Sequence, residues 1–227
     1  MIGQRQLFVR LADCNLACAY CDTAHRAGPA WRAEREPGSA LLVEHPNPVA
    51  AEILTGLVAD WQRQLPLHQA LVLTGGEPLL QSAALAGWLP AVTGLLPVYL
   101  ETNGTLPEAL AEVLPSITWV SMDIKLDEVT GEPTPWAAHA AFLAAAGAKT
   151  CQVKLVIDAA TTAAAVAGVA AFVRRHAPQV PLVLQPRTVA GRPTVAGGYL
   201  LELQAAAART HLPTLVIPQM HPLLAIR

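Results

Sequence analysis

The sequence predicts an α/β fold, an incomplete (partial) TIM-like barrel of βα units, on three observations. Apolar, β-branched runs alternate with stretches rich in Ala and Leu, which is typical of repeated βα units around a parallel sheet. These runs give six or seven strands, fewer than the eight of a complete barrel. Most predicted strands end in a polar string, as expected where the carboxyl ends of parallel strands line a ligand-binding face.

The predicted elements follow in order along the chain. The strands are residues 6–12, 70–74, 98–101, 119–124, 152–157, 182–185 and 214–217. The helices are residues 48–64, 80–95, 107–114, 136–146, 162–176 and 198–210. Pro48 and Pro107 are predicted in first turns and Gly147 at a helix end. Residues 24–46, rich in Gly, Pro and charge, are predicted to form a long irregular segment.

Composition narrows the class of protein. A chain of 227 residues fits a single domain over residues 1–227, and its 53% hydrophobic content predicts a large core. No apolar run approaches the ~20 residues of a membrane span, so no membrane partner is expected. The net charge of −2 and the lack of a Lys/Arg run argue against a nucleic-acid partner. Four cysteines are too few for a secreted disulfide scaffold, which favours the cytoplasm.

Three cysteines form a short loop near the start, Cys14, Cys18 and Cys21, with the spacing C-x3-C-x2-C. Three thiolates on one loop suit three corners of a [4Fe–4S] cluster and leave the fourth iron open to a small molecule. With His25 the same cysteines could instead form a structural Cys3His zinc site. Cys151 lies on a predicted buried strand, where a thiol acts as a small hydrophobe, so we do not expect a fourth ligand there.

A second string, Thr74-Gly75-Gly76-Glu77-Pro78, closes a predicted strand with two glycines that let a ligand approach the backbone. With the cysteine loop and its aromatic Tyr20, this string resembles the radical S-adenosylmethionine (SAM) superfamily. The resemblance implies a partial barrel of the radical SAM type, with a [4Fe–4S] cluster on Cys14, Cys18 and Cys21. It also implies that Gly75, Gly76 and Glu77 contact the methionyl end of SAM, and that the cofactors supply a 5′-deoxyadenosyl radical while the protein positions the reactants.

A finer resemblance is to the 7-carboxy-7-deazaguanine synthase family of queuosine biosynthesis, a tRNA modification pathway. The strings that carry it are Phe8-Val9-Arg10-Leu11-Ala12, Cys14-Asn15-Leu16, Cys21-Asp22-Thr23, Thr74-Gly75-Gly76-Glu77-Pro78-Leu79-Leu80-Gln81, Glu101-Thr102-Asn103-Gly104-Thr105, Asp123-Ile124-Lys125-Leu126, Val153-Lys154-Leu155-Val156, Leu184-Gln185-Pro186 and Pro218-Gln219-Met220-His221. It implies a radical SAM lyase that converts 6-carboxy-5,6,7,8-tetrahydropterin to 7-carboxy-7-deazaguanine with loss of ammonia. An electron donor such as flavodoxin or ferredoxin, and a homodimer, are further expectations.

The family resemblance implies substrate contacts at Arg10, Asp22, Gln185 and His221, and a Mg²⁺ ion on Thr23. The chemistry of these residues agrees, since Arg pairs with carboxylates and Mg²⁺ takes oxygen ligands. Other roles remain open at this point. Asp22 or Thr23 could only cap the loop, Arg10 could form a surface salt bridge, and His221 could be a tail histidine with no function.

Six residues at strand ends are predicted to line the SAM side: Glu101, Thr102, Asn103, Ser121, Asp123 and Lys125. Asn103-Gly104 alone would be an ordinary turn. Asp123 and Lys125 share one face of their strand and could instead pair with each other.

Two other functions compete, an activase that installs a glycyl radical on a partner protein and a non-catalytic zinc-bound scaffold. Family members usually carry a longer N-terminal segment with a Gln-Gly-Glu-Gly string, whereas residues 1–13 alone precede Cys14 here. A late start, a truncation or a different mode of substrate binding would each account for this. We expect a late start or a truncation, which should weaken substrate binding more than cluster assembly.

Overall fold

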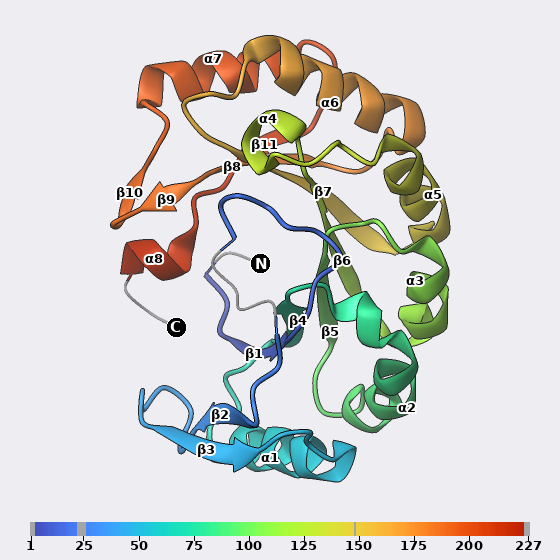
Figure 1. Cartoon of the computed structure of the whole chain (residues 1–227), viewed down its shortest axis with the longest axis vertical. Helices are drawn as coiled ribbons and strands as arrows, with labels where there is room; N and C mark the ends of the chain where they lie inside the picture. The colour runs from blue at the N-terminus through green and yellow to red at the C-terminus, as the bar shows by residue number, and fades with distance from the viewer. Residues whose placement is uncertain (1–2, 22–25, 148, 225–227) are drawn as a thin grey trace. The chain divides into compact units, whose positions relative to one another are not determined.

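The structure is a computed structural model that describes residues 3–21, 26–147 and 149–224. The chain forms two compact units, each built from strands and helices (Figure 1). Unit 1 comprises Met1–Asn15, Asp22–Glu101 and Ala109–Trp119, and unit 2 comprises Leu16–Cys21, Thr102–Glu108 and Val120–Arg227. The predicted α/β class is confirmed.

Unit 1 is organised around β4, whose continuous apolar run fits a strand covered on both faces. Its neighbours are in the order β1-β4-β5, and both pair with it in parallel. The strands and helices are β1 (Gln6–Leu11), β2 (Ala30–Glu34), β3 (Leu42–Pro46), α1 (Ala51–Gln64), β4 (Ala70–Gly75), the 3-10 helix η1 (Pro78–Gln81), α2 (Ser82–Val92), β5 (Val98–Thr102), α3 (Pro107–Val113) and the 3-10 helix η2 (Leu114–Ser116). Helices α1 and α2 are joined by a hydrogen bond from Trp88 Nε1 to Thr55 Oγ1 at 3.0 Å.

Unit 2 has the strand order β6-β7-β8-β11, with β8 parallel to both β7 and β11. Its elements are β6 (Trp119–Ile124), α4 (Asp127–Thr130), α5 (Trp136–Ala146), β7 (Thr150–Ile157), α6 (Ala163–His176), β8 (Leu182–Pro186), β9 (Thr188–Val189), β10 (Arg192–Pro193), α7 (Gly197–Ala208), β11 (Thr214–Val216) and α8 (Met220–Leu224). Helices α6 and α7 pack against each other (Figure 1). The core includes Met122, Phe142, Leu155 and Leu203, all fully buried.

Several helix ends form as their sequences predict. Pro107 begins α3, and Gly147 follows α5 with a left-handed φ of 49°. Thr162 caps α6 by accepting a hydrogen bond from Ala165 N at 3.1 Å. Predicted strand ends differ from the observed ones by one or two residues, because fraying ends carry little sequence signal.

Other predictions were wrong. Pro48 lies before α1 rather than in its first turn, because Asn47 N still donates to Pro29 O and the helix begins only at Ala51. The predicted helix over residues 80–95 is a 3-10 turn followed by α2, which ends at Val92. The short elements α4, α8, β9 and β10 were not predicted, because they have too few residues to show a helical or strand repeat of apolar side chains.

The segment predicted as irregular, residues 24–46, contains the antiparallel hairpin of β2 and β3. Trp31 stacks on His45 across the hairpin at 4.6 Å between ring centroids. The Glu34 carboxylate accepts hydrogen bonds from Gly38 N and Ala40 N, which closes the connecting loop. Within the described residues, no helix is long and apolar enough to span a bilayer.

Candidate functional site

In unit 1 the chain leaving β1 is bound to the chain leaving β4 through the main chain. Gly76 N donates to Leu11 O at 2.9 Å, and Glu77 N donates to Asp13 O at 2.8 Å. Cys14 follows directly. The Gly-Gly-Glu-Pro string therefore fixes the backbone that leads into the first cysteine of the loop.

The two glycines of this string are required because the main chain of residues 11–13 lies against them. At Gly76 an added Cβ would lie 1.8 Å from Asp13 O, far inside van der Waals contact. At Gly75 it would lie 2.1 Å from Leu11 O, and φ is +125°, a region that side chains rarely adopt. The close approach inferred from the sequence is thus present, and its partner in the structure is the β1 backbone.

Two acidic residues of unit 1 have defined local partners. Glu77 is fully buried, and its Oε1 accepts a hydrogen bond from Leu79 N at 3.0 Å, which caps η1. Thr74 Oγ1 donates to Glu101 Oε2 at 3.1 Å and orients that half-buried carboxylate at the end of β5. Both residues thus have structural contacts in addition to the SAM contacts predicted for them.

After β5 the chain turns through a short loop of unit 2, residues 102–105. Gly104 N donates to Thr102 Oγ1 at 3.1 Å, and Thr105 N and Oγ1 donate to Asn103 Oδ1 at 3.1 and 2.6 Å. Gly104 has a φ of +67°, and a Cβ there would lie 2.3 Å from Met122 Cγ. The predicted turn is therefore present and packs directly on β6.

His139 of α5 contacts this loop, and no feature of the sequence predicted that contact. Its imidazole is fully buried, and Nδ1 lies 3.1 Å from Gly104 O. Burial lowers the pKa of His139, outweighing the bond to Gly104 and the nearby Asp123 carboxylate, which act in the opposite direction. The neutral ring donates through Nδ1–H, while Nε2 has no hydrogen-bond partner among the described residues.

On β6 and β7 a buried carboxylate faces two ammonium groups. Asp123 Oδ2 lies 2.7 Å from Lys125 Nζ and 3.5 Å from Lys154 Nζ. Burial would raise the pKa of Asp123, but the two lysines outweigh it and hold the pKa below its ordinary value. Asp123 Oδ1 is buried without a hydrogen-bond partner among the described residues. The pairing of Asp123 with Lys125 that the sequence left open does occur.

Lys125 also reaches the cysteine loop. Its Nζ donates to Tyr20 Oη at 3.1 Å, and the Arg187 guanidinium lies 5.7 Å from the centre of the Tyr20 ring. Burial, reinforced by the Asp123 carboxylate, raises the pKa of the Tyr20 hydroxyl to about 12, so it stays protonated. Burial would lower the pKa of Lys125, but Asp123 and Tyr20 raise it, and the ammonium keeps its charge.

The remaining predicted residues that the structure describes lie on separate elements. Ser121 Oγ on β6 accepts a hydrogen bond from Gln152 Nε2 at 3.0 Å. Gln185 is half-buried on β8, and His221 is exposed on α8. Arg10 is exposed on β1, opposite Thr74 of β4 in the strand register. Asp22, Thr23 and His25 lie outside the described residues.

The cysteines differ in burial. Cys14 and Cys18 are half-buried and Cys21 is exposed, whereas Cys151 is buried on β7. Burial raises the pKa of Cys151 to about 12, which fits the predicted role as a small hydrophobe. Within the ranges described, no three His, Cys, Asp or Glu side chains form a metal-binding group. The thiols of the loop are chemically suited to iron, and the loop itself holds a turn from Cys21 N to Cys18 O at 3.0 Å.

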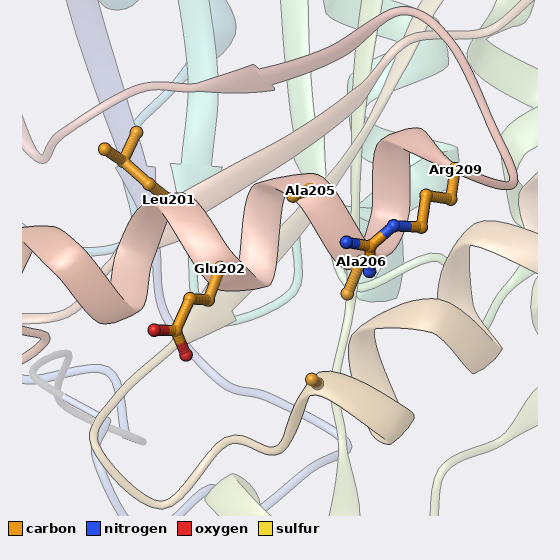
Figure 2. A pocket seen from close by; sticks show the side chains of 6 residues that line it. Leu201, Glu202, Ala205, Ala206 and Arg209 are labelled. Atoms are coloured by element: carbon orange, nitrogen blue, oxygen red, sulfur yellow. The ribbon is translucent and has the colours of Figure 1, made fainter.

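A hollow of about 450 Å³ lies elsewhere on unit 2 (Figure 2). It is lined by Ala163 of α6 and by five residues at the C-terminal part of the chain, Leu201, Glu202, Ala205, Ala206 and Arg209. None of these is a strand-end or loop residue with predicted chemistry. We therefore place the candidate site at the strand ends and not in this hollow.

Comparison with known proteins gave consistent results, although no protein-family model matches the sequence. A 7-carboxy-7-deazaguanine synthase of Geobacter sulfurreducens is 38% identical over 228 residues, covering 97% of this chain and 90% of its own. One of Thermococcus kodakarensis is 34% identical over 220 residues, covering 91% and 83%.

Solved structures of Streptococcus suis SuiB resemble the fold. One has a TM-score of 0.64 at 14% identity over 95% of this chain, and another, bound to S-adenosylmethionine, has a TM-score of 0.63. The chain spans about half the length of SuiB, since 49% of that chain is covered. The likeness concerns the fold, and the predicted partial barrel is consistent with it.

Substituting Gly76 should distort the unit 1 part of the site. Gly76→Ala places a methyl group against Asp13 O. Because this oxygen belongs to the main chain, no change of side-chain rotamer can relieve the clash. We expect the free energy of unfolding to fall by about 1–3 kcal/mol in urea titrations, the usual cost of overpacking. Gly87→Ala is the matched control, because nothing lies within 4 Å and the position is inside α2. It should raise the free energy by roughly 0.5–1 kcal/mol. Equal effects of the two changes would contradict the close approach.

His139 should make stability depend on pH. Its pKa is lowered in the folded state, so the unfolded chain binds a proton more readily as the pH falls below about 6.5. The free energy of unfolding should therefore decrease from pH 7 towards pH 5. His139→Asn cannot titrate, although its amide can still donate to Gly104 O, and should show a shallower decrease over that range. Parallel profiles for the two proteins in urea titrations would rule out this contribution.

Proposed function

The chain belongs to the 7-carboxy-7-deazaguanine synthase family of radical SAM lyases, and we propose that it converts 6-carboxy-5,6,7,8-tetrahydropterin to 7-carboxy-7-deazaguanine and ammonia. The observation that carries this proposal is the 38% identity to the Geobacter sulfurreducens synthase along 97% of the chain. The polar strand ends and the cysteine loop lie inside that matched length.

The proposed reaction contracts a ring and removes one nitrogen as ammonia. Substrate and product differ by the atoms of ammonia alone, so the reaction consumes no net oxidant or reductant. SAM can then be regenerated after each turnover, acting as a cofactor. The role proposed for the protein is therefore to position the substrate and SAM, and no residue is assigned as a general acid or base.

Three thiols would hold the [4Fe–4S] cluster, those of Cys14, Cys18 and Cys21. When bound, the cluster and SAM would supply the radical chemistry that removes a hydrogen atom from the substrate. The donor set supports this, since thiolates are the usual ligands of such clusters. The methionyl end of SAM would contact Gly75, Gly76 and Glu77.

The SAM side would be completed by Glu101, Thr102, Asn103, Ser121, Asp123 and Lys125. Asp123 gives the clearest support, because its ionised Oδ1 is buried without a partner in the described residues. A buried acceptor of this kind gains from a donor supplied by a ligand, such as a hydroxyl or an amino group.

The substrate would contact Arg10, Asp22, Gln185 and His221, with a Mg²⁺ ion on Thr23. Arg10 supplies a cation for the carboxylate, and the Gln185 amide both donates and accepts towards a pterin edge. Arg10 and His221 are exposed in the structure and could reach a small molecule. Asp22 and Thr23 are proposed from the sequence.

We also propose that both units act together as one radical SAM domain in a cytoplasmic homodimer of the queuosine pathway. Flavodoxin or ferredoxin would supply the electron. Family membership favours the pterin reaction over a glycyl-radical activase. A zinc scaffold would give a colourless protein after anaerobic reconstitution, whereas a cluster gives a brown one.

Turnover and its dependence on one cysteine test the proposal. The anaerobically reconstituted chain should form 7-carboxy-7-deazaguanine from the pterin, identified by mass and absorbance. Cys18→Ala should lose the cluster absorbance and all turnover, because the remaining thiols cannot hold three irons. Cys151→Ala removes a buried thiol on β7 and should retain iron and product formation. A reconstituted, SAM-cleaving chain that leaves the pterin unchanged would overturn the proposed reaction.

The magnesium assignment has its own test. Thr23→Ala removes the proposed oxygen ligand, so turnover should lose most of its response to added Mg²⁺ while SAM cleavage remains. Thr23→Ser keeps the hydroxyl and should keep the response. An unchanged Mg²⁺ titration for the alanine variant would exclude Thr23 as a ligand.

A further inference from the structure

The unit 2 part of the cysteine loop, Leu16–Cys21, is attached at two points to the segment from Lys125 to Thr130, which follows β6 and includes α4. Ala19 N donates to Thr130 O at 2.9 Å, which fixes the main chain between Cys18 and Cys21. Lys125 Nζ donates to Tyr20 Oη at 3.1 Å, which fixes the next side chain. One attachment uses the backbone and the other uses a charged side chain, and both act on adjacent residues of the loop.

The backbone attachment is itself held firmly. Thr130 is almost fully buried at the end of α4, and its Oγ1 donates to Leu126 O at 2.8 Å. Gly131, with a φ of +77°, ends this helix and lets its N donate to Asp127 O. The short helix therefore presents the Thr130 carbonyl in a fixed direction.

The side-chain attachment depends on charge. Lys125 Nζ donates one hydrogen bond to Asp123 Oδ2 at 2.7 Å and a second to Tyr20 Oη. The bond to Asp123 fixes the position of the ammonium group that Tyr20 contacts. Lys154 Nζ lies 3.5 Å from the same carboxylate oxygen, so two ammonium groups contact one carboxylate. Because the Tyr20 phenol is neutral, its oxygen can accept this charge-assisted hydrogen bond.

We propose that Lys125 is a positioning residue that, through Tyr20, holds the loop bearing Cys18 and Cys21 in the geometry needed for the cluster. This role rests on the proposed function for the cluster itself, but the contact is present without it. An ammonium has three donors, and the two used here leave one for a ligand. Lys125 thus links the residues proposed for SAM to the loop proposed for iron.

The hydroxyl can be separated from the ring. Tyr20→Phe keeps the ring beside Arg187 and removes only the oxygen that accepts from Lys125. Tyr199→Phe is the matched control, because Tyr199 Oη donates to Thr161 O at 2.8 Å from α7, outside the cysteine loop. Lys125→Met removes the donor while Asp123 remains paired with Lys154.

Amide hydrogen exchange of the chain without cluster is the first measurement. Tyr20→Phe and Lys125→Met should each speed exchange over residues 16–21 about tenfold, as expected for the loss of one charge-assisted hydrogen bond. The double variant should exchange no faster than Lys125→Met, because both changes remove the same contact. Tyr199→Phe should match the wild-type chain over these residues.

Iron release from the reconstituted protein is the second measurement. A chelator should remove iron about tenfold faster from Tyr20→Phe than from the wild type or Tyr199→Phe. Wild-type exchange over residues 16–21 in both Tyr20→Phe and Lys125→Met would overturn the proposal, whatever the activity. If the reconstituted, SAM-cleaving wild-type chain leaves the pterin unchanged while both variants exchange faster, the proposed function is overturned and the positioning role stands.

Discussion

A buried carboxylate facing two ammonium groups is the interaction on which the unit 2 part of the site depends. Asp123 is nearly withdrawn from water, where an isolated charge would be costly, and Lys125 and Lys154 together make it stable as an anion. Because an ammonium has three donors, Lys125 can donate to Asp123 and to Tyr20 at the same time. Losing the anion would remove the carboxylate that Lys125 and Lys154 both contact, so the cofactor residues and the loop depend on one group.

Unit 1 uses a different kind of interaction to hold the chain that leads into Cys14. The β1 and β4 exits are joined by main-chain hydrogen bonds from Gly76 and Glu77, with no charge involved. Those bonds join neutral main-chain groups, whereas the Asp123 group joins one carboxylate to two ammonium groups. Truncating a side chain can therefore disrupt the Asp123 group but cannot remove a main-chain hydrogen bond.

The sequence predicted the main strands to within two residues and the main helices to within three, because their apolar runs are long and periodic. The β2–β3 hairpin was missed, since the Trp31–His45 stack and the Glu34 hydrogen bonds are cross-strand contacts inside a polar segment. Polar strand ends located the Asp123–Lys125 pair. Its contact with Tyr20 joins residues 105 apart, a distance that no local pattern spans. His139 lies in an alanine-rich helix that resembles any core helix.

The close approach at Gly76 also limits how sequences of this kind can vary. Most packing conflicts are relieved when the neighbouring side chain becomes smaller, which produces pairs of positions that change together. Here the neighbour is the carbonyl oxygen of residue 13, which every amino acid carries. No second change can make room, so position 76 should have no covarying partner. A distant sequence without glycine there would have to direct its first strand along another path.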